Sequence, residues 1–147
     1  MDVAAIASAL AARLGAITPP SGYDAIQQAT HLLPNGIVNT PTVLVFPPEI
    51  DSTFSGHKRS TDMVFPVRFF IAMTSDRPRA LTELYAWQEG LFDQLEGLYD
   101  LGLAPPVTHA VILSMSAGTG EYAEKDYAVI ELEVGVHVEE GYTPTTT

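Results

Sequence analysis

The segment from Asp126 to Val138 constrains the fold most, because two sets of residues alternate along it without a break. One set is apolar throughout: Ala128, Ile130, Leu132, Val134, Val136 and Val138. The other set is mixed: Tyr127, Val129, Glu131, Glu133, Gly135 and His137. A two-residue period places the sets on opposite faces of a β-strand. The segment therefore predicts a long strand with one face on a hydrophobic core and the other face open.

Three further segments have the composition of strands, at residues 40–46, 62–73 and 107–116. The first is rich in β-branched residues and ends at Pro47 and Pro48. In the second, one face is wholly apolar: Phe65, Val67, Phe69, Ile71 and Met73. Its other face also carries Arg68, which indicates a sheet covered by helices on one side only. The polar residues 49–61 are predicted to connect the first two strands.

Apolar residues at three- and four-residue steps predict helices over residues 2–14 and 77–96. Gly15 is expected to cap the first helix at its C-terminus. In the second, the predicted apolar arc comprises Leu81, Leu84, Tyr85, Trp87, Leu91, Phe92 and Leu95. Residues 23–33 are expected to form a short additional helix between two turn-rich stretches.

The order of these elements predicts an α+β fold. Two hairpins form a mostly antiparallel four-stranded sheet, and the N-terminal helix and the main amphipathic helix pack on one face of it. Residues 1–140 are expected to make a single domain of this kind, and residues 141–147 a disordered C-terminal tail.

Composition narrows the classes of protein. No apolar run in the 147 residues approaches the roughly 20 needed to span a bilayer, and no basic region precedes the first apolar residues. We therefore expect a soluble protein made in the cytoplasm, without a signal peptide or a membrane partner. The chain has no cysteine, which excludes disulfides and thiolate metal sites. Its formal charge of −11 argues against a surface that clamps nucleic-acid phosphates.

No catalytic motif is present, so we expect neither an enzyme nor a bound cofactor. Residues 118–123 match the loose dinucleotide pattern G-x-G-x-x-A. That pattern requires a strand before it and a helix after it, whereas a strand is predicted to follow here. We interpret Gly118 to Ala123 as a flexible hairpin loop.

Two groups of polar residues are candidate sites. If the last two strands pair, His109 would approach Glu131 or Glu133, a set able to bind a metal or exchange protons. The alternative is an exposed polar face that meets only water, and the sheet register decides between them. The second group is Phe54, His57, Lys58 and Arg59, an aromatic residue with cations in a polar loop. Such a composition is typical of an interface anchor, or else of an ordinary solvated loop.

The chain resembles the tail terminator (tail completion) proteins of long-tailed bacteriophages. The resemblance covers about residues 1–140 and lies in the pattern and length of the chain, since no signature motif carries it. An N-terminal helix leads to Thr42–Pro48, a long polar hairpin connection leads to Met63–Ile71, a single helix covers Leu81–Leu95, and two strands end at Val134–Val138. The turn-rich segment from Ser21 to Gly36 departs from this pattern.

The resemblance implies a virion protein without catalysis that forms a homo-hexameric ring at the head-proximal end of the tail, assembled in the host cytoplasm. The ring stops polymerisation of the tail tube protein, meets a head-side connector protein and lets genomic DNA pass without specific binding. On this interpretation Glu131 and Glu133 help to line the lumen, and Phe54, His57, Lys58 and Arg59 contact a neighbouring subunit or partner. The alternatives are a head–tail connector, a stopper or another minor tail protein and, in another class, a small metal- or ligand-binding module.

Overall fold

The computed structural model describes residues 2–95 and 107–141, and these form two helices and a mixed six-stranded sheet. The elements are α1 (Val3–Gly15), β1 (Gln28–Thr30), β2 (Thr42–Val45), β3 (Glu49–Ser55), β4 (Lys58–Met73), α2 (Arg77–Leu95), β5 (Val107–Tyr122) and β6 (Lys125–Gly141). The predicted α+β class is confirmed. The predicted four-stranded antiparallel sheet is wrong, because β1 and β3 add to it and β1 runs parallel to β2.

The sheet is ordered β1-β2-β4-β6-β5, and β3 also pairs with β4. Since β6 runs along one side of β4, both β2 and β3 occupy its other side, one after the other. Val45 is opposite Val67 and Glu49 is opposite Val64, so one extra residue is accommodated between them. Prolines 47 and 48 stand at that irregularity. The row formed by β2 and β3 is therefore interrupted at the proline pair, and the border of the sheet on this side consists of β1, outside β2, and of β3.

A two-residue turn joins β5 to β6. Ala123 and Glu124 both have positive φ, 51° and 68°, and Tyr122 pairs with Lys125 across the turn. The flexible loop predicted at residues 118–123 is therefore wrong, because Gly118 and Gly120 lie within β5. A strand follows them, as expected, so the segment lacks the helix N-terminus that a dinucleotide pyrophosphate needs.

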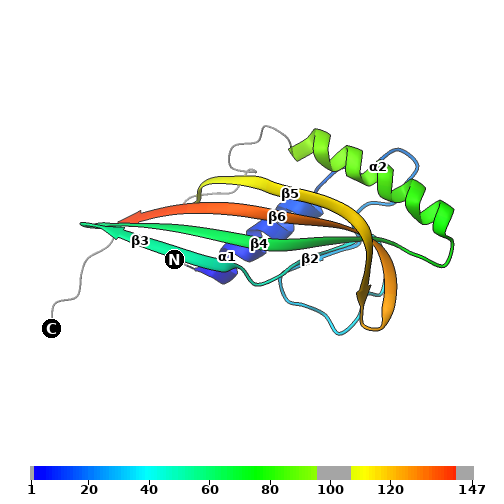
Figure 1. Cartoon of the computed structure of the whole chain (residues 1–147), viewed down its shortest axis with the longest axis horizontal. Coiled ribbons are helices and arrows are strands. Elements are labelled where there is room, and N and C mark those ends of the chain that lie inside the picture. The colour runs from blue at the N-terminus through cyan, green and yellow to red at the C-terminus, as the bar shows by residue number, and fades with distance from the viewer. Residues whose placement is uncertain (1, 96–106, 142–147) are drawn as a thin grey trace.

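Both helices pack on one face of the sheet and share one core with it (Figure 1). The largest helical contributions come from Leu10, Leu14, Leu84, Trp87 and Leu91, which are all buried. The sheet meets them with Phe65, Val67, Phe69 and the alternating apolar residues of β6. The half-buried strand predicted over 126–138 is confirmed, since Ala128, Ile130, Leu132, Val134, Val136 and Val138 are all buried.

A capping aspartate precedes each of the two helices. The Asp2 carboxylate accepts a hydrogen bond from the Ala5 N–H, and Asp76 accepts one from the Arg79 N–H. The C-cap of α1 is Ala16, not Gly15 as predicted. The apolar arc predicted for α2 is too wide, because Leu81, Tyr85 and Phe92 are exposed. They lie along one edge of the buried stripe, and residue 96 lies outside the described residues.

Two segments adopt a different secondary structure from the one predicted. Residues 23–33 form no helix; the Gln27 N–H donates to the Pro41 carbonyl at 2.8 Å, and the chain continues as β1 beside β2. The polar connection predicted over 49–61 contains β3 and the start of β4, joined by a turn at Gly56 and His57. In both cases the backbone pairs with the next strand of the chain, β1 with β2 and β3 with β4, although the side chains show no period that predicts the pairing.

The face of the sheet opposite the helices, here called the open face, carries a smaller cluster at one end. Its buried members are Leu44, Phe70, Tyr127 and Val129. Residues 31–41 lie beside this cluster, where Ile37 packs on it and the Tyr122 hydroxyl donates to the Pro34 carbonyl. At the other end, β3 and the paired ends of β4 and β6 extend into a narrow tip (Figure 1). We call residues 49–62 and 137–141 the arm.

The arm ends at Gly141, the last residue of β6, which pairs with Lys58. The rest of the predicted disordered tail, residues 142–147, lies outside the described residues. Within the described residues, neither helix is long and apolar enough to cross a membrane.

Candidate functional site

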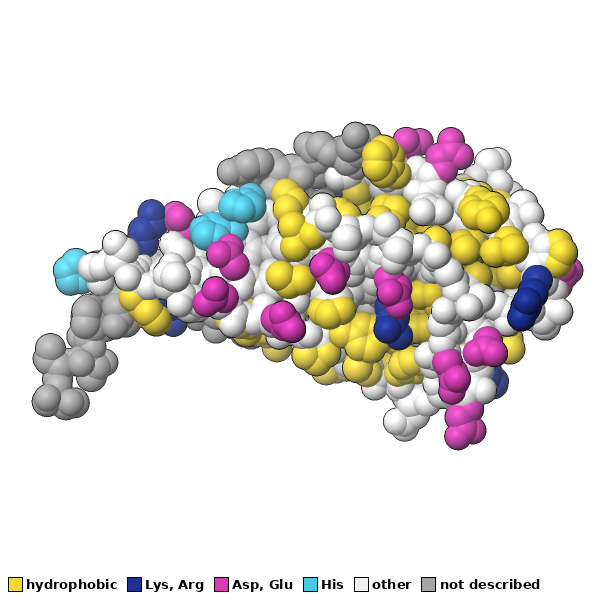
Figure 2. All heavy atoms as spheres, viewed as in Figure 1, with side chains coloured by type: hydrophobic (Ala, Val, Ile, Leu, Met, Phe, Trp, Pro, Cys, Tyr) yellow, Lys and Arg dark blue, Asp and Glu magenta, His cyan; other side chains and the backbone are white. Residues whose placement is uncertain are grey.

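The open face carries most of the polar residues that the sequence singled out. Acidic side chains are spread along it, with hydrophobic side chains between them (Figure 2). Along β6 every second residue contributes to this face, because side chains alternate on a strand. These residues are Glu131, Glu133, Gly135, His137 and Glu139. The β6 strand lies between β4 and β5, so its open-face side chains run along the middle of the surface.

The two glutamates proposed from the sequence differ in their surroundings. Glu131 is opposite Arg68, and the two form an ion pair with 3.2 Å between Nε and Oε1. The Arg68 guanidinium also lies over the Phe46 ring, 5.4 Å from its centroid. Glu133 is opposite Pro66 on one side and Ser114 on the other, and no cation of the described chain pairs with it. Glu133 is therefore the more effective negative charge of the two.

The structure does not bring His109 to Glu131 or Glu133. His109 pairs in register with His137, and their rings stack with centroids 4.8 Å apart and an interplanar angle of 11°. Glu133 lies four positions before His137 on an extended strand, which places it about 13 Å away. The predicted two-carboxylate, one-histidine group is wrong, and no cluster suited to a metal ion occurs among the described residues.

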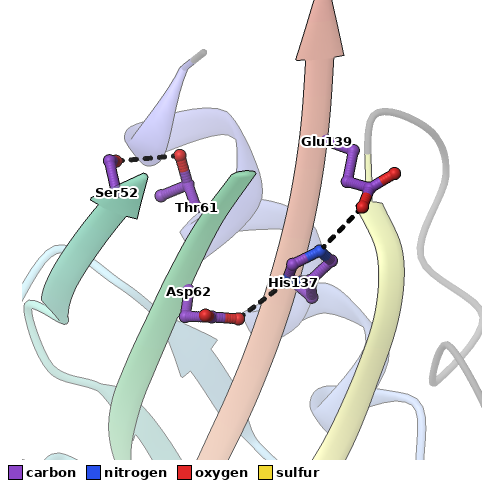
Figure 3. Close-up of polar contacts among 5 residues, drawn as sticks. All are labelled: Ser52, Thr61, Asp62, His137 and Glu139. Atoms are coloured by element: carbon purple, nitrogen blue, oxygen red, sulfur yellow. Dashed lines mark hydrogen bonds and ion pairs between the residues drawn. The ribbon is translucent and has the colours of Figure 1, made fainter. Parts of the chain in front are cut away.

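A different polar cluster lies at the base of the arm (Figure 3). The Nδ1 atom of His137 is 2.7 Å from the Asp62 carboxylate, and its Nε2 atom is 3.4 Å from the Glu139 carboxylate. The second oxygen of Glu139 is 3.0 Å from the Lys58 ammonium group. We call Asp62, His109, His137, Glu139 and Lys58 the histidine cluster. It joins three strands, β4, β5 and β6.

Hydrogen bonding shifts the pKa values of two groups in this cluster in opposite directions. The hydrogen bond to Asp62 is the main cause that raises the pKa of His137, with smaller contributions from Glu139, while burial opposes the rise. The hydrogen bond from Lys58 is the main cause that lowers the pKa of Glu139. An imidazolium donates from both ring nitrogens, which suits a ring held between two carboxylates.

The proposed interface residues Phe54, His57, Lys58 and Arg59 lie together at the tip of the arm, in the β3–β4 hairpin. Phe54 is 58% exposed. Both cations are paired within the chain, Lys58 with Glu139 and Arg59 with Glu140, the latter at 2.6 Å. The hydrogen bond from Arg59 is the main cause that lowers the pKa of Glu140. The basic side chains therefore fasten the hairpin to the end of β6.

Comparison with models of known protein families and with curated proteins gives no match to this chain.

Sequence reasoning missed Asp62, His137 and Glu139 as partners. The alternation along β6 does place His137 and Glu139 on the face of Glu131 and Glu133, so part of the signal was present. The missing information was the register between β4 and β6, which sets Asp62 opposite His137.

Proposed function

We propose that this chain is the subunit of a ring that ends the tail tube of a long-tailed bacteriophage and joins the tail to the head. The observation that carries the proposal is the open face, where carboxylates occupy the central strand of a surface that no helix of the described chain covers. The resemblance in element order supports it as well. The protein would then be a virion component at the head-proximal end of the tail.

The charge balance of the open face suits a surface past which DNA moves. On this face Lys58 and Arg68 are each held by a carboxylate, while Glu133 pairs with no cation among the described residues. Nucleic-acid affinity depends on cations that neutralise phosphates, and a surface with excess negative charge repels the backbone instead. The open face would line the lumen and let DNA pass without binding it.

The partners follow from the same proposal. Other copies of the chain complete the ring, the tail tube protein lies below it, and a head-side connector protein lies above it. No cofactor is part of the proposed function, because closing a tube and joining two assemblies require surfaces rather than chemistry.

The first test is capping. Purified protein is mixed with tail tubes that lack their terminal ring, and tube length and end structure are followed by negative-stain microscopy. We expect tubes to stop growing and to acquire a ring at one end. Tubes that grow unchanged, or binding to filled heads instead of tails, would contradict the terminator function.

The second test concerns the lumen. The substitution Glu133→Lys reverses the unpaired charge on the open face. DNA should then adhere to this face and leave the particle more slowly. The matched control is Glu89→Lys, the same charge change on an exposed residue of α2, on the helix side of the molecule. Ejection is followed by the fluorescence of a DNA-binding dye after receptor addition. Equal ejection rates for both variants would rule out the open face as the lumen surface.

A further inference from the structure

We propose that the outer edge of β5 in one copy pairs with the outer edge of β3 in the next copy, so that the sheet continues from subunit to subunit. The inference rests on the proposed function, because it names the surface through which the ring closes. It is carried by the geometry of the two sheet borders rather than by the open face.

The strand β5 is a border of the sheet, and within the described residues it pairs only with β6. The turn at Ala123 and Glu124 tells which of its backbone groups face outward. In a two-residue hairpin with both turn residues at positive φ, the closing pair, here Tyr122 and Lys125, exchanges both hydrogen bonds. Since backbone groups alternate in direction, those of Ala117 and Thr119 face away from β6.

The second half of this border lacks the prolines, basic residues and bulges that normally prevent edge pairing. Native edges are protected by lysine, proline or bulges. Two bulges do interrupt β5, but at residues 108 and 113, in its first half. Residues 114–122 pair regularly with β6 and contain no proline, lysine or arginine. Their side chains from Ser116 to Gly120 are small, which leaves the backbone accessible to another strand.

The strand β3 is the complementary border. It spans seven residues, contains no proline, and pairs on one side with β4 and with no second strand of the described chain. Its open-face acids, Glu49 and Asp51, would meet the uncharged stretch from Ser114 to Gly120, so no like charges come face to face.

The two borders are different surfaces, and their pairing is therefore head-to-tail, the arrangement that closes into a ring. Pairing of β5 with itself would instead give a two-fold dimer and leave β3 exposed. In a closed ring neither β5 nor β3 keeps a free edge, which removes the aggregation hazard that these unprotected strands carry in a monomer.

The first experiment removes one outward N–H group. Ala117→Pro deletes the donor from the free side of β5 and keeps the bonds to β6, since proline is tolerated where the N–H faces away from the sheet. Ala117→Val is the matched control, because it enlarges the side chain and keeps the donor. Circular dichroism and the melting temperature establish that both variants are folded. Sedimentation velocity then measures self-association, and microscopy measures capping of tail tubes.

We expect Ala117→Pro to weaken ring formation about tenfold or more, and Ala117→Val to retain it. If the wild-type protein caps tubes and folded Ala117→Pro caps them equally well, the edge inference is overturned while the terminator function stands. If the wild-type protein neither assembles nor caps, the proposed function itself has failed.

The second experiment identifies the partner edge and does not depend on stability. The chain has no cysteine, so Ser116→Cys on β5 with Thr53→Cys on β3 introduces the only thiols, both on the open-face side of their strands. Residues 51 and 55 replace residue 53 in parallel variants to cover the neighbouring registers. Mild oxidation of assembled rings should give a ladder of covalent multimers up to the full ring. Single-cysteine variants should give none beyond a dimer, and a ladder absent from all three pairs would overturn the pairing with β3.

Discussion

At the scale of single residues, His137 makes stability depend on pH in a direction that can be stated. Its pKa is raised in the folded protein, so the folded state holds the proton more tightly than the unfolded state. The extra stability is fully present below about pH 6.5, the ordinary histidine pKa, and is lost as pH rises through the raised pKa. We expect the melting-temperature difference between the wild-type protein and His137→Gln to be largest in mild acid and to shrink above neutrality.

The control for this prediction is Asp62→Asn, which removes the main cause of the raised pKa. In that background the effect of His137→Gln should depend less on pH, as a double-mutant cycle measures directly. If the melting-temperature difference between the wild-type protein and His137→Gln stays constant from mild acid to mild base, the imidazole of His137 does not gain a proton in the cluster. In stronger acid, protonation of Glu139 and Glu140, whose pKa values are lowered, should weaken the arm.

Two glycines should respond to alanine in opposite directions. A β-carbon on Gly15 would lie 2.6 Å from the Ala29 Cβ atom, so α1 and β1 would have to move apart. We expect Gly15→Ala to lower the free energy of unfolding by about 1–3 kcal/mol. On Gly90 the nearest atoms, from Gln94 and Pro20, lie at 3.9 and 4.0 Å. Gly90→Ala should therefore raise the free energy of unfolding by about 0.5–1 kcal/mol, because alanine has the higher helix propensity.

Urea unfolding of the two glycine variants checks both predictions. A stabilised Gly15→Ala would show that the helix end and β1 are not in contact in solution.

At the scale of elements, the link between residues 31–41 and the β5–β6 hairpin depends on Tyr122. Its hydroxyl donates to the Pro34 carbonyl, and its ring packs on Phe70 with centroids 5.4 Å apart. Tyr122→Phe keeps the ring and deletes the hydrogen bond, so the free energy of unfolding should fall by about 0.5–1.5 kcal/mol. Hydrogen exchange of residues 31–41 should rise as well.

Tyr85→Phe is the matched control, because Tyr85 is 62% exposed on α2. It should leave both stability and exchange unchanged. Equal behaviour of the two variants would mean that the hydroxyl of Tyr122 does not hold the segment.

The elements that the sequence predicted are those with a one-sided core. The β6 strand and the two helices carry an apolar period because each buries one face, and this period is local information. The strand β3 could not be predicted in this way, since all of its residues but Ser52 are exposed and its pairing with β4 supplies the order. The three residues of β1 depend likewise on pairing, in their case with β2.

The candidate site was predictable in composition and unpredictable in register. Counting back from the Tyr122–Lys125 pair without interruption would place His109 opposite Val138, on the core side. The bulge at residue 113 shifts His109 opposite His137, on the open face. No pattern in the side chains of β5 predicts that bulge, so the histidine cluster could be recognised only from the structure.

At the scale of the whole molecule, the formal charge of −11 opposes any assembly of identical copies. Salt screens such repulsion, and the screening length falls from about 30 Å at 0.01 M to about 8 Å at 0.15 M ionic strength. We therefore expect self-association to strengthen as salt is added, which sedimentation velocity at several salt concentrations would show. Weakening with salt would indicate instead that ion pairs between copies dominate the interface.

The central ladder of the sheet has a mechanical consequence. Every residue of β4 except Ile71 is paired with β6, from the tip of the arm at Lys58 to Met73 at the other end of the strand. Because these hydrogen bonds lie across the strands, a pull on the arm along its length loads them together in shear rather than one after another. The arm and the body of the molecule would therefore respond to tension as one stiff unit. Force would pass along the sheet without the hydrogen bonds between β4 and β6 opening one after another.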